Sequence, residues 1–374
     1  MRCHQITLNE WPDQLEWPFK PDLILVFGPR RQLVPDHVYP ALQRSAPNAI
    51  VLGCSTAGDI AGTRVSDDAL IVTGIALAQT TLRLETIDVS ADIDSRMAGA
   101  ALARRLHDPA LRHVLVLSDG LNVNGSELAG GLRDGLPPNV VATGGLAGDG
   151  AAFEATVVLA NAPAVPNRVA ALGWYGDNIR VGYGSLGGWD AFGPSRLVTR
   201  SDKNVLYRLD DEAALDVYMR YLGHHADELP SSGLLFPLAL TLPGVEEPVV
   251  RTILSVDRAA GSLTFAGDVP QGCSVQLMHA NFDRLIDGAI AAADDSVLPL
   301  DGPAQLALLI SCVGRKLVLK QRIEEEVEGV REVVGPAATL AGFYSYGEIC
   351  PQKRFAPCEL HNQTMTITTF SEVP

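Results

Sequence analysis

The sequence predicts an α/β protein of mixed α+β character, built from two packed domains with mixed sheets and an internal duplication. Three observations support this prediction. The chain has 374 residues, of which 47% are hydrophobic, enough for two domains with buried cores. Strand-like and helix-like patterns alternate along it, and one order of six such elements occurs twice. Glycine-rich residues at 187–196 separate the halves, so we expect domains at 20–193 and 194–374.

The first elements are expected to be buried strands around one helix. Residues 1–20, rich in tryptophan, proline and acids, are expected to be irregular. A continuous apolar run at 23–27 is typical of a strand buried on both faces. A helix is expected at 35–45, where a proline occupies the first turn. Strands are expected at 48–52 and 68–78.

Two copies of a six-element pattern follow. The first is expected to contain a strand at 82–89, a helix at 95–107, a strand at 113–118, a helix at 126–136, a strand into a turn at Gly145 and a strand at 153–160. The second is expected to contain, in the same order, 274–279, 282–293, 305–311, 320–334, a strand into a turn at Gly342 and a closing strand within 359–370. This repetition indicates an internal duplication, although any chain that alternates strands and helices looks periodic.

The segment between these copies is expected to be mostly strands. Hairpins are expected at 170–183 and 197–209. Residues 210–223 carry an apolar stripe at helical spacing and end in a glycine, which favours a capped helix. Further strands are expected at 234–242, 249–257 and 262–266.

Three turns combine glycines with a following acid. They lie at 53–59, 144–149 and 342–348, and their acids are Asp59, Asp149 and Glu348. Because glycine has no Cβ, backbone N–H groups in such turns can approach a ligand closely, and the acid can accept a hydrogen bond from an amine or hydroxyl. We expect the three acids to occupy equivalent places in one ligand site. The site is also expected to include Gly53, Cys54, Ser55, Gly144 and Gly145. The alternative is that the glycines only allow tight corners, which the acids cap.

Polar residues also follow two apolar strands. Asp119 and Asn122 come after the strand at 113–118, and Arg315 comes after the strand at 305–311. Ligands bind where polar groups emerge at the ends of packed strands, so these residues are candidates for the same site. The alternative is a polar loop at the surface.

Composition excludes several classes of protein. The formal net charge of −15 argues against nucleic acid as a partner, because no basic field would attract phosphates. The first residues do not resemble a secretory signal, and no apolar stretch is long enough to span a bilayer. The six cysteines lack the spacing of a disulfide framework. We therefore expect a cytoplasmic protein with no membrane partner.

Several stretches resemble the FIST family. Residues 53–60, 144–149 and 187–193 resemble its N-terminal domain. Residues 204–207, 265–270, 311–315, 342–349 and 360–366 resemble its C-terminal domain. The resemblance covers roughly residues 20–371 and implies a sensory protein of signal transduction that binds a small ligand and is not an enzyme. Tyr344, Tyr346 and Asn362 lie in these stretches and join the candidate ligand-binding residues.

The resemblance also suggests haem. Some stand-alone bacterial members of the family bind haem and sense nitric oxide, and they act on a separate histidine kinase or cyclic-di-GMP enzyme. Haem iron requires His, Cys, Met or Tyr. His361, within a family-like run, is the first candidate, and His279 is its alternative in the other half. Either histidine could instead be purely structural.

Three other chemistries stay open. The acids of the glycine turns could hold an amino acid or a similar metabolite without haem. Cys54, at a strand-to-turn corner, could be the nucleophile of a hydrolase, although no histidine or acid is tied to it by a motif. Cys350, Cys358 and His361 could bind zinc, but a structural zinc site needs a fourth ligand and usually has closely paired cysteines.

Overall fold

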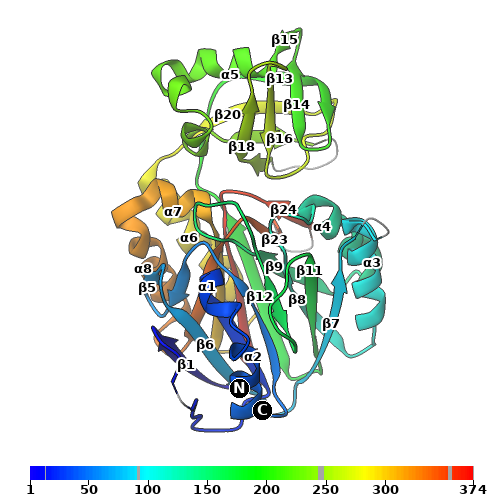
Figure 1. Cartoon of the computed structure of the whole chain (residues 1–374), viewed down its shortest axis with the longest axis vertical. Coiled ribbons are helices and arrows are strands. Elements are labelled where there is room, and N and C mark those ends of the chain that lie inside the picture. Colours follow the sequence, from blue (N-terminus) through cyan, green and yellow to red (C-terminus); the bar gives the residue numbers. More distant parts are fainter. Residues whose placement is uncertain (13, 91–92, 243–247, 353–355, 374) are drawn as a thin grey trace.

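The computed structural model describes the whole chain except residues 13, 91–92, 243–247, 353–355 and 374. It consists of a large body and a smaller lobe (Figure 1). The lobe begins in β13 (Asp190–Asp202) and ends in β20 (Ser274–His279). These strands pair antiparallel, with Asp190 opposite His279, so two adjacent strands connect the lobe to the body. Both chain termini lie at the end of the body that is remote from the lobe (Figure 1).

Three mixed sheets form the body. The first sheet has the order β1 (Arg2–Leu8), β6 (Leu70–Ala76), β2 (Leu23–Gly28), β3 (Ile50–Ser55) and β10 (Val158–Ala160). The second has the order β7 (Thr81–Asp88), β11 (Arg168–Tyr175), β8 (Leu111–Ser118), β9 (Val141–Leu146), β23 (Gly347–Pro351) and β24 (Cys358–His361). The third has the order β12 (Ile179–Leu186), β25 (Met365–Glu372), β21 (Leu306–Cys312), β22 (Thr339–Ser345), β4 (Asp59–Ala61) and β5 (Arg64–Ser66).

The three sheets share one pairing pattern. From the first strand onward, neighbours pair antiparallel, antiparallel, parallel and antiparallel in each sheet. Each sheet also receives a strand from another unit: β3 continues into β4 of the third sheet, β9 leads to β10 of the first, and β22 continues into β23 of the second. The body is therefore a ring of three interlocked units, and the expected duplication corresponds to the second and third of them.

The third unit differs from the expected second copy in its first strand. The first strand of the third sheet is β12, whereas the strand expected at 274–279 is β20, which lies in the lobe. The lobe is thus an insertion between β12 and α6 (Phe282–Val297). Residues 1–20, expected to be irregular, contain β1, because its pairing with β6 extends the first sheet. A strand was expected at 153–160, but only its last three residues, Val158–Ala160, form one (β10).

Apolar side chains from all three sheets meet in one central core. Phe27 of β2, Leu117 of β8 and Phe343 of β22 are fully buried there, and the ring centroids of Phe27 and Phe343 lie 4.8 Å apart. The strand expected at 23–27 is buried along its whole length, as predicted. Such double-sided burial requires the continuous apolar runs seen in the sequence.

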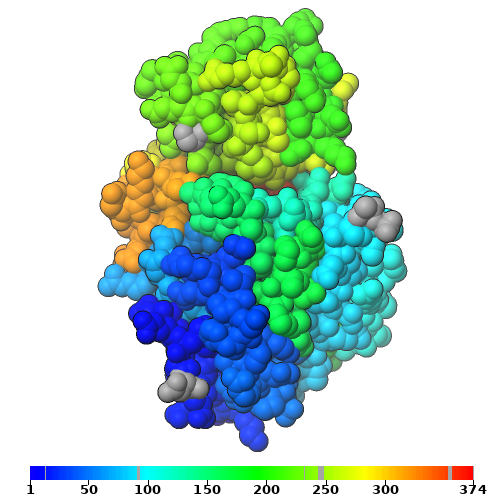
Figure 2. Space-filling view, viewed as in Figure 1, coloured from blue at the N-terminus to red at the C-terminus, as the bar shows by residue number. Residues whose placement is uncertain are grey.

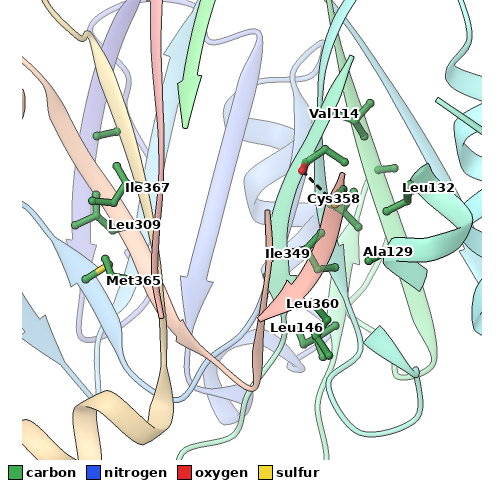
Figure 3. Packing of buried hydrophobic residues seen from close by; sticks show 14 of the residues in the cluster. Val114, Ala129, Leu132, Leu146, Leu309, Ile349, Cys358, Leu360, Met365 and Ile367 are labelled. Atoms are coloured by element: carbon green, nitrogen blue, oxygen red, sulfur yellow. Dashed lines mark hydrogen bonds between the residues drawn. The ribbon is translucent and has the colours of Figure 1, made fainter. Parts of the chain in front are cut away.

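Helices cover the outer faces of the sheets. The helices on the first sheet are α1 (Arg30–Leu33) and α2 (Val38–Ser45), those on the second are α3 (Ser95–Leu106) and α4 (Gly125–Gly135), and α6 and α8 (Ile323–Val334) cover the third. Figure 3 shows Cys358 and Leu360 of β24 beside Ala129 and Leu132 of α4, with the Cys358 thiol donating to the Ala142 carbonyl at 3.4 Å. The short α7 (Val313–Leu319) follows β21 directly and leads through η3 (Lys320–Arg322) to α8.

The lobe is a sheet covered by one helix. Its strand order is β17 (Val249–Arg251), β16 (Leu238–Thr241), β20, β13, β14 (Val205–Leu209), β19 (Ser262–Phe265) and β18 (Ile253–Asp257), with β15 (Glu212–Ala213) beside β14. The helix is α5 (Ala214–Leu222), which ends at Gly223 in a left-handed conformation with φ 57°, as its sequence predicted. The short helices η1 (Gly223–Glu228) and η2 (Ser231–Leu235) follow.

The boundary expected at 193/194 falls inside β13, and strands from both sides of it pair within the second and third sheets. The division into 20–193 and 194–374 stays a prediction about domains. In the described part of the chain, every helix is too short or too polar to cross a lipid bilayer.

Candidate functional site

The three glycine turns occupy equivalent positions in the ring. A Cβ added at Gly53, Gly144 or Gly342 would lie 2.0, 1.8 or 1.9 Å from a carbonyl oxygen of the paired strand. Only glycine fits where the backbones approach so closely. These residues are therefore required for packing.

The turns contact one another directly. The Ala57 N–H donates to the Tyr344 carbonyl at 2.8 Å, and the Tyr344 N–H donates to the Gly58 carbonyl at 2.8 Å. The Gly148 N–H donates to the Ser55 carbonyl at 2.9 Å. The turns therefore meet, as the sequence suggested, but they meet in close contact and leave their backbone groups paired with each other.

Two of the three acids are equivalent. Asp59 lies opposite Phe343 and Glu348 lies opposite Gly145, at the same register of neighbouring sheets. The corresponding residue of the first sheet is Val158, opposite Cys54. The expectation that Asp149 is the third equivalent acid is wrong, because Asp149 begins a longer turn at 149–157 that precedes β10.

Asp59 and Glu348 are buried carboxyls held by nearby hydroxyls. The Thr56 hydroxyl donates to Asp59 at 2.7 Å and the Ser345 hydroxyl donates to Glu348 at 2.5 Å. Burial raises the pKa of each carboxyl to about 8, although these hydrogen bonds lower it. Both acids are consequently neutral at pH 7, a state unsuited to binding an amine by charge.

Asp119 organises a loop. It is fully buried and accepts hydrogen bonds from the N–H groups of Leu121, Asn122 and Asn167 at 2.7–2.9 Å, and from the Thr156 hydroxyl at 2.9 Å. With both oxygens occupied, this carboxylate positions the loop after β8.

Arg315 holds the region around α7 together. Its fully buried guanidinium lies 2.8 Å from the Glu326 carboxylate and donates to the Leu285 carbonyl at 2.7 Å and to the Gly187 carbonyl. The Tyr344 hydroxyl donates to the same Glu326 carboxylate at 2.9 Å. Arg315 and Tyr344 are thereby committed to packing.

The proposed iron ligand and nucleophile are also enclosed. His361 is buried in β24, where Nε2 lies 2.9 Å from the Cys350 carbonyl oxygen, and burial lowers its pKa to about 4. His279 Nδ1 lies 3.4 Å from the Ala280 carbonyl oxygen. Burial raises the pKa of the Cys54 thiol well above its ordinary value, which suppresses its reactivity. Within the described residues, no three His, Cys, Asp or Glu side chains are placed to hold a metal ion.

One open site lies elsewhere, at the junction of the lobe and the body (Figure 2). We call it the interlobe cleft, a cavity of about 690 Å³. On the lobe side, its walls include Glu228, Pro230, Ser232, Leu234, Leu235, Thr252, Ile253, Leu254 and Ala266. On the body side, they include Leu121, Ala151, Phe153, Cys312, Val313, Gly314, Leu317, Val318, Lys320, Tyr346 and Asn362.

Exposed apolar side chains gather at this cleft. Leu121, Phe153, Leu254 and Leu317 are 37%, 40%, 42% and 36% exposed, and all four line it. Large apolar side chains grouped at an opening usually mark a binding surface. The cleft therefore offers a mainly apolar surface to a ligand.

Two buried polar atoms on the cleft walls have no hydrogen-bond partner among the described residues. They are Oδ1 of Asn362, on the body, and Oγ1 of Thr252, on the lobe. An unpaired buried polar group costs about 1–3 kcal/mol. A ligand that paired with either atom would recover this cost.

The turn at 149–157 forms one edge of the cleft. The Phe153 and Tyr346 rings are stacked with centroids 4.3 Å apart and an interplanar angle of 13°. The Tyr346 hydroxyl donates to the Asp149 carboxylate, which also accepts from the Glu154 and Ala155 N–H groups at 2.8 Å. Burial raises the pKa of Asp149, but these hydrogen bonds outweigh it and leave the pKa below its ordinary value.

The structure thus separates the residues expected to form one site. Tyr346 and Asn362 line the interlobe cleft, Asn122 lines an adjoining cavity of about 250 Å³, and Asp149 lines a cavity of about 780 Å³ across the turn. The following residues line none of these cavities: Gly53, Cys54, Ser55, Asp59, Asp119, Gly144, Gly145, Arg315, Tyr344, Glu348, His361 and His279. Sequence reasoning missed Phe153, Leu254 and Leu317, because apolar residues at such positions look like ordinary core. It also missed Thr252, a lone threonine within an expected strand.

Comparison with known proteins identifies two adjoining regions. The model of the FIST N domain matches residues 22–212, and the model of the FIST C domain matches residues 214–351. No curated protein is significantly similar to the chain. A chorismatase structure is similar at a TM-score of 0.35 and 10% identity, covering 98% of each chain. A cyanuric acid hydrolase from A. caulinodans is similar at a TM-score of 0.37 and 9% identity, covering 95% of this chain and 90% of the other. These scores are too low to support an argument about activity.

Proposed function

Because the chain belongs to the FIST family, whose domains are sensory domains of signal transduction that bind small ligands, we propose that it senses a small molecule bound in the interlobe cleft. The proposed role is recognition without catalysis, in the cytoplasm. The burial of Cys54 gives no support to the alternative of a hydrolase.

One observation supports this proposal: apolar side chains and residues that carry unpaired polar atoms line the same cleft from both the lobe and the body. Leu254 and Thr252 lie on the lobe, and Leu317 and Asn362 lie on the body. The volume of about 690 Å³ falls within the usual range for small-molecule sites. A ligand there would cover apolar surface and complete hydrogen bonds in one step.

The proposed mechanism is a ligand-dependent change in the position of the lobe. Besides the two connecting strands, the lobe contacts the body through a buried apolar cluster, which includes Val250 of the lobe and Leu285 and Val318 of the body, and through polar groups. Arg251 donates to the Leu360 carbonyl at 3.0 Å, and Asn124 donates to Asp268 at 3.1 Å. An interface that combines polar contacts with one small apolar cluster permits relative motion of two parts. A ligand that touches both walls favours the position in which both contacts form, and a partner protein would read that position.

A histidine kinase or a cyclic-di-GMP enzyme is the proposed partner class, as the resemblance to the family suggests. A haem-bound nitric oxide sensor is the competing hypothesis for the ligand. The cleft residues fit haem poorly: no histidine is among the described residues that line it, and His361 is enclosed in β24. Burial raises the pKa of the Cys312 thiol, and the Tyr346 hydroxyl already donates to Asp149, so neither lining side chain is suited to bind iron. We therefore favour a ligand that is not haem.

Two matched variants test the proposal. Leu254→Trp fills the cleft from the lobe, whereas Leu197→Trp changes a similarly exposed leucine of the lobe that lines none of the four main cavities. In a thermal-shift screen of metabolites, a ligand is expected to raise the melting temperature of the wild type and of Leu197→Trp but not of Leu254→Trp. Equal shifts in all three proteins would refute the cleft as the site.

A spectroscopic titration separates the two ligand hypotheses. Haem is added to the wild type and to Leu254→Trp, and the visible spectrum is recorded before and after nitric oxide. A Soret band that moves with nitric oxide in the wild type would favour the haem hypothesis, and its retention in His361→Ala would exclude His361 as the iron ligand. We expect no specific haem spectrum.

A further inference from the structure

We infer that the ligand of the interlobe cleft is an uncharged aromatic molecule that carries an N–H or O–H donor. This inference rests on the proposed function and specifies the chemical class that the cleft selects. It follows from three features of the described lining: its charged side chains are exposed to solvent, two of its buried polar atoms are unpaired, and an aromatic pair is stacked at its edge.

Charge is confined to the rim of the cleft. Among its described lining residues, Glu228 and Lys320 are exposed to solvent. Burial raises the pKa of the Cys312 thiol and of the Tyr346 hydroxyl, so both are neutral. The nearby Arg315 is already paired with Glu326. A carboxylate or phosphate inside the cleft would lose its hydration without gaining a counter-charge.

The unpaired atoms call for a donor on the ligand. The Asn362 amide nitrogen donates to the His361 carbonyl at 3.1 Å, whereas no group in the described part of the chain donates to Oδ1 of the same side chain. Asn362 is fully buried, so bulk water does not reach this atom freely. The Thr252 hydroxyl, on the opposite wall, can accept or donate. A hydrocarbon or an ether would leave Oδ1 unpaired.

The apolar part of the ligand is expected to be aromatic. Phe153 stacks on Tyr346 and still exposes 40% of its surface at the cleft. A ring that stacks on Phe153 would extend this pair at the usual aromatic spacing. Leu121, Leu254 and Leu317 supply the remaining apolar contacts.

Two compound series test the class by calorimetry on the full chain. The first contains indole, 1-methylindole and indole-3-carboxylate, and the second contains phenol, anisole and 4-hydroxybenzoate. In each series the second compound lacks the donor and the third adds a negative charge. We expect a parent compound to bind with a dissociation constant below about 1 mM. The methylated and carboxylated partners are expected to bind at least about fivefold more weakly.

Variants connect this preference to the cleft. Asn362→Leu removes the acceptor, so the preference for a parent over its methylated partner is expected to disappear. Thr252→Val, which keeps the side-chain shape, provides a second variant if Asn362→Leu does not fold, and it is expected to reduce the same preference. Binding of the parents that survives Leu254→Trp would refute the cleft itself, and with it the proposed function.

Other outcomes overturn the class alone. These are tighter binding of a carboxylated compound, equal binding of a methylated compound, and no binding of either parent at about 1 mM. If the metabolite screen finds a charged or non-aromatic ligand that Leu254→Trp blocks, the class is wrong and the proposed function stands.

Discussion

Replacing Glu348 with glutamine is expected to stabilise the protein by an amount that grows with pH. Glu348 is fully buried, and its two oxygens accept from the Ser345 hydroxyl at 2.5 Å and from the Thr364 hydroxyl at 3.0 Å. Burial raises its pKa from 4.5 to about 8, although these hydrogen bonds lower it. Glutamine has the same shape, can donate to Ser345 and accept from Thr364, and never ionises.

The sign and size follow from proton linkage. The folded protein holds a proton that the unfolded chain releases above its ordinary pKa of 4.5. The stabilising contribution of Glu348 is therefore complete below that pH and is lost as the pH rises through the folded pKa of about 8. The gap between 4.5 and about 8 corresponds to about 5 kcal/mol in total. About half of this loss, roughly 2–3 kcal/mol, falls between pH 5 and pH 7.

Urea unfolding at pH 5, 6, 7 and 8 measures this effect. The free energy of unfolding of Glu348→Gln minus that of the wild type is expected to increase by about 2–3 kcal/mol from pH 5 to pH 7. Glu328→Gln, a change at an exposed glutamate of α8, is expected to show no such increase. A difference that stays constant across this pH range would refute the assignment of a buried, protonated Glu348.

Two further predictions concern packing. Arg315→Met leaves the buried Glu326 carboxylate without its partner, so the free energy of unfolding is expected to fall by about 3–5 kcal/mol. A fall of less than about 1 kcal/mol in urea unfolding would contradict this account. Gly342→Ala places a Cβ 1.9 Å from a backbone carbonyl and is expected to cost more than about 3 kcal/mol. Gly302→Ala, with open space around it, should change the melting temperature little. Similar melting temperatures for the two alanine variants would show that the ring tolerates a side chain at this turn.

Local patterns predicted much of the body. The apolar run at 23–27 and the glycine turns have close equivalents in the structure, because burial on both faces and close backbone contact restrict which residues fit. The register of Asp59 and Glu348 also follows from the repeated pattern of the turns. The turn that begins at Asp149 is longer than the turns that contain Asp59 and Glu348. The repeated pattern did not show that Asp149 therefore occupies a different position.

Long-range pairing could not be predicted in this way. The sequence pattern of a strand followed by a helix fits β12 before α6 and equally fits β20 before α6. Only the pairing of the strands shows that β12 belongs to the body and β20 to the lobe. The strands β4, β10 and β23 each join the sheet of another unit, and no local pattern in the sequence indicates this exchange. The candidate site depends on the same information, since Asn362 and Thr252 face one cleft only after the lobe has docked on the body.

The exchange of strands also affects how a nascent chain can fold on the ribosome. The strands β4 and β5 pair with each other and are made early, yet β22, the other partner of β4, lies far along the chain. The third sheet is therefore incomplete until β22 has been synthesised, and until then β4 and β5 expose an unpaired edge. Such an edge can pair with other chains, so the yield of native protein should depend on the chaperones that protect the growing polypeptide.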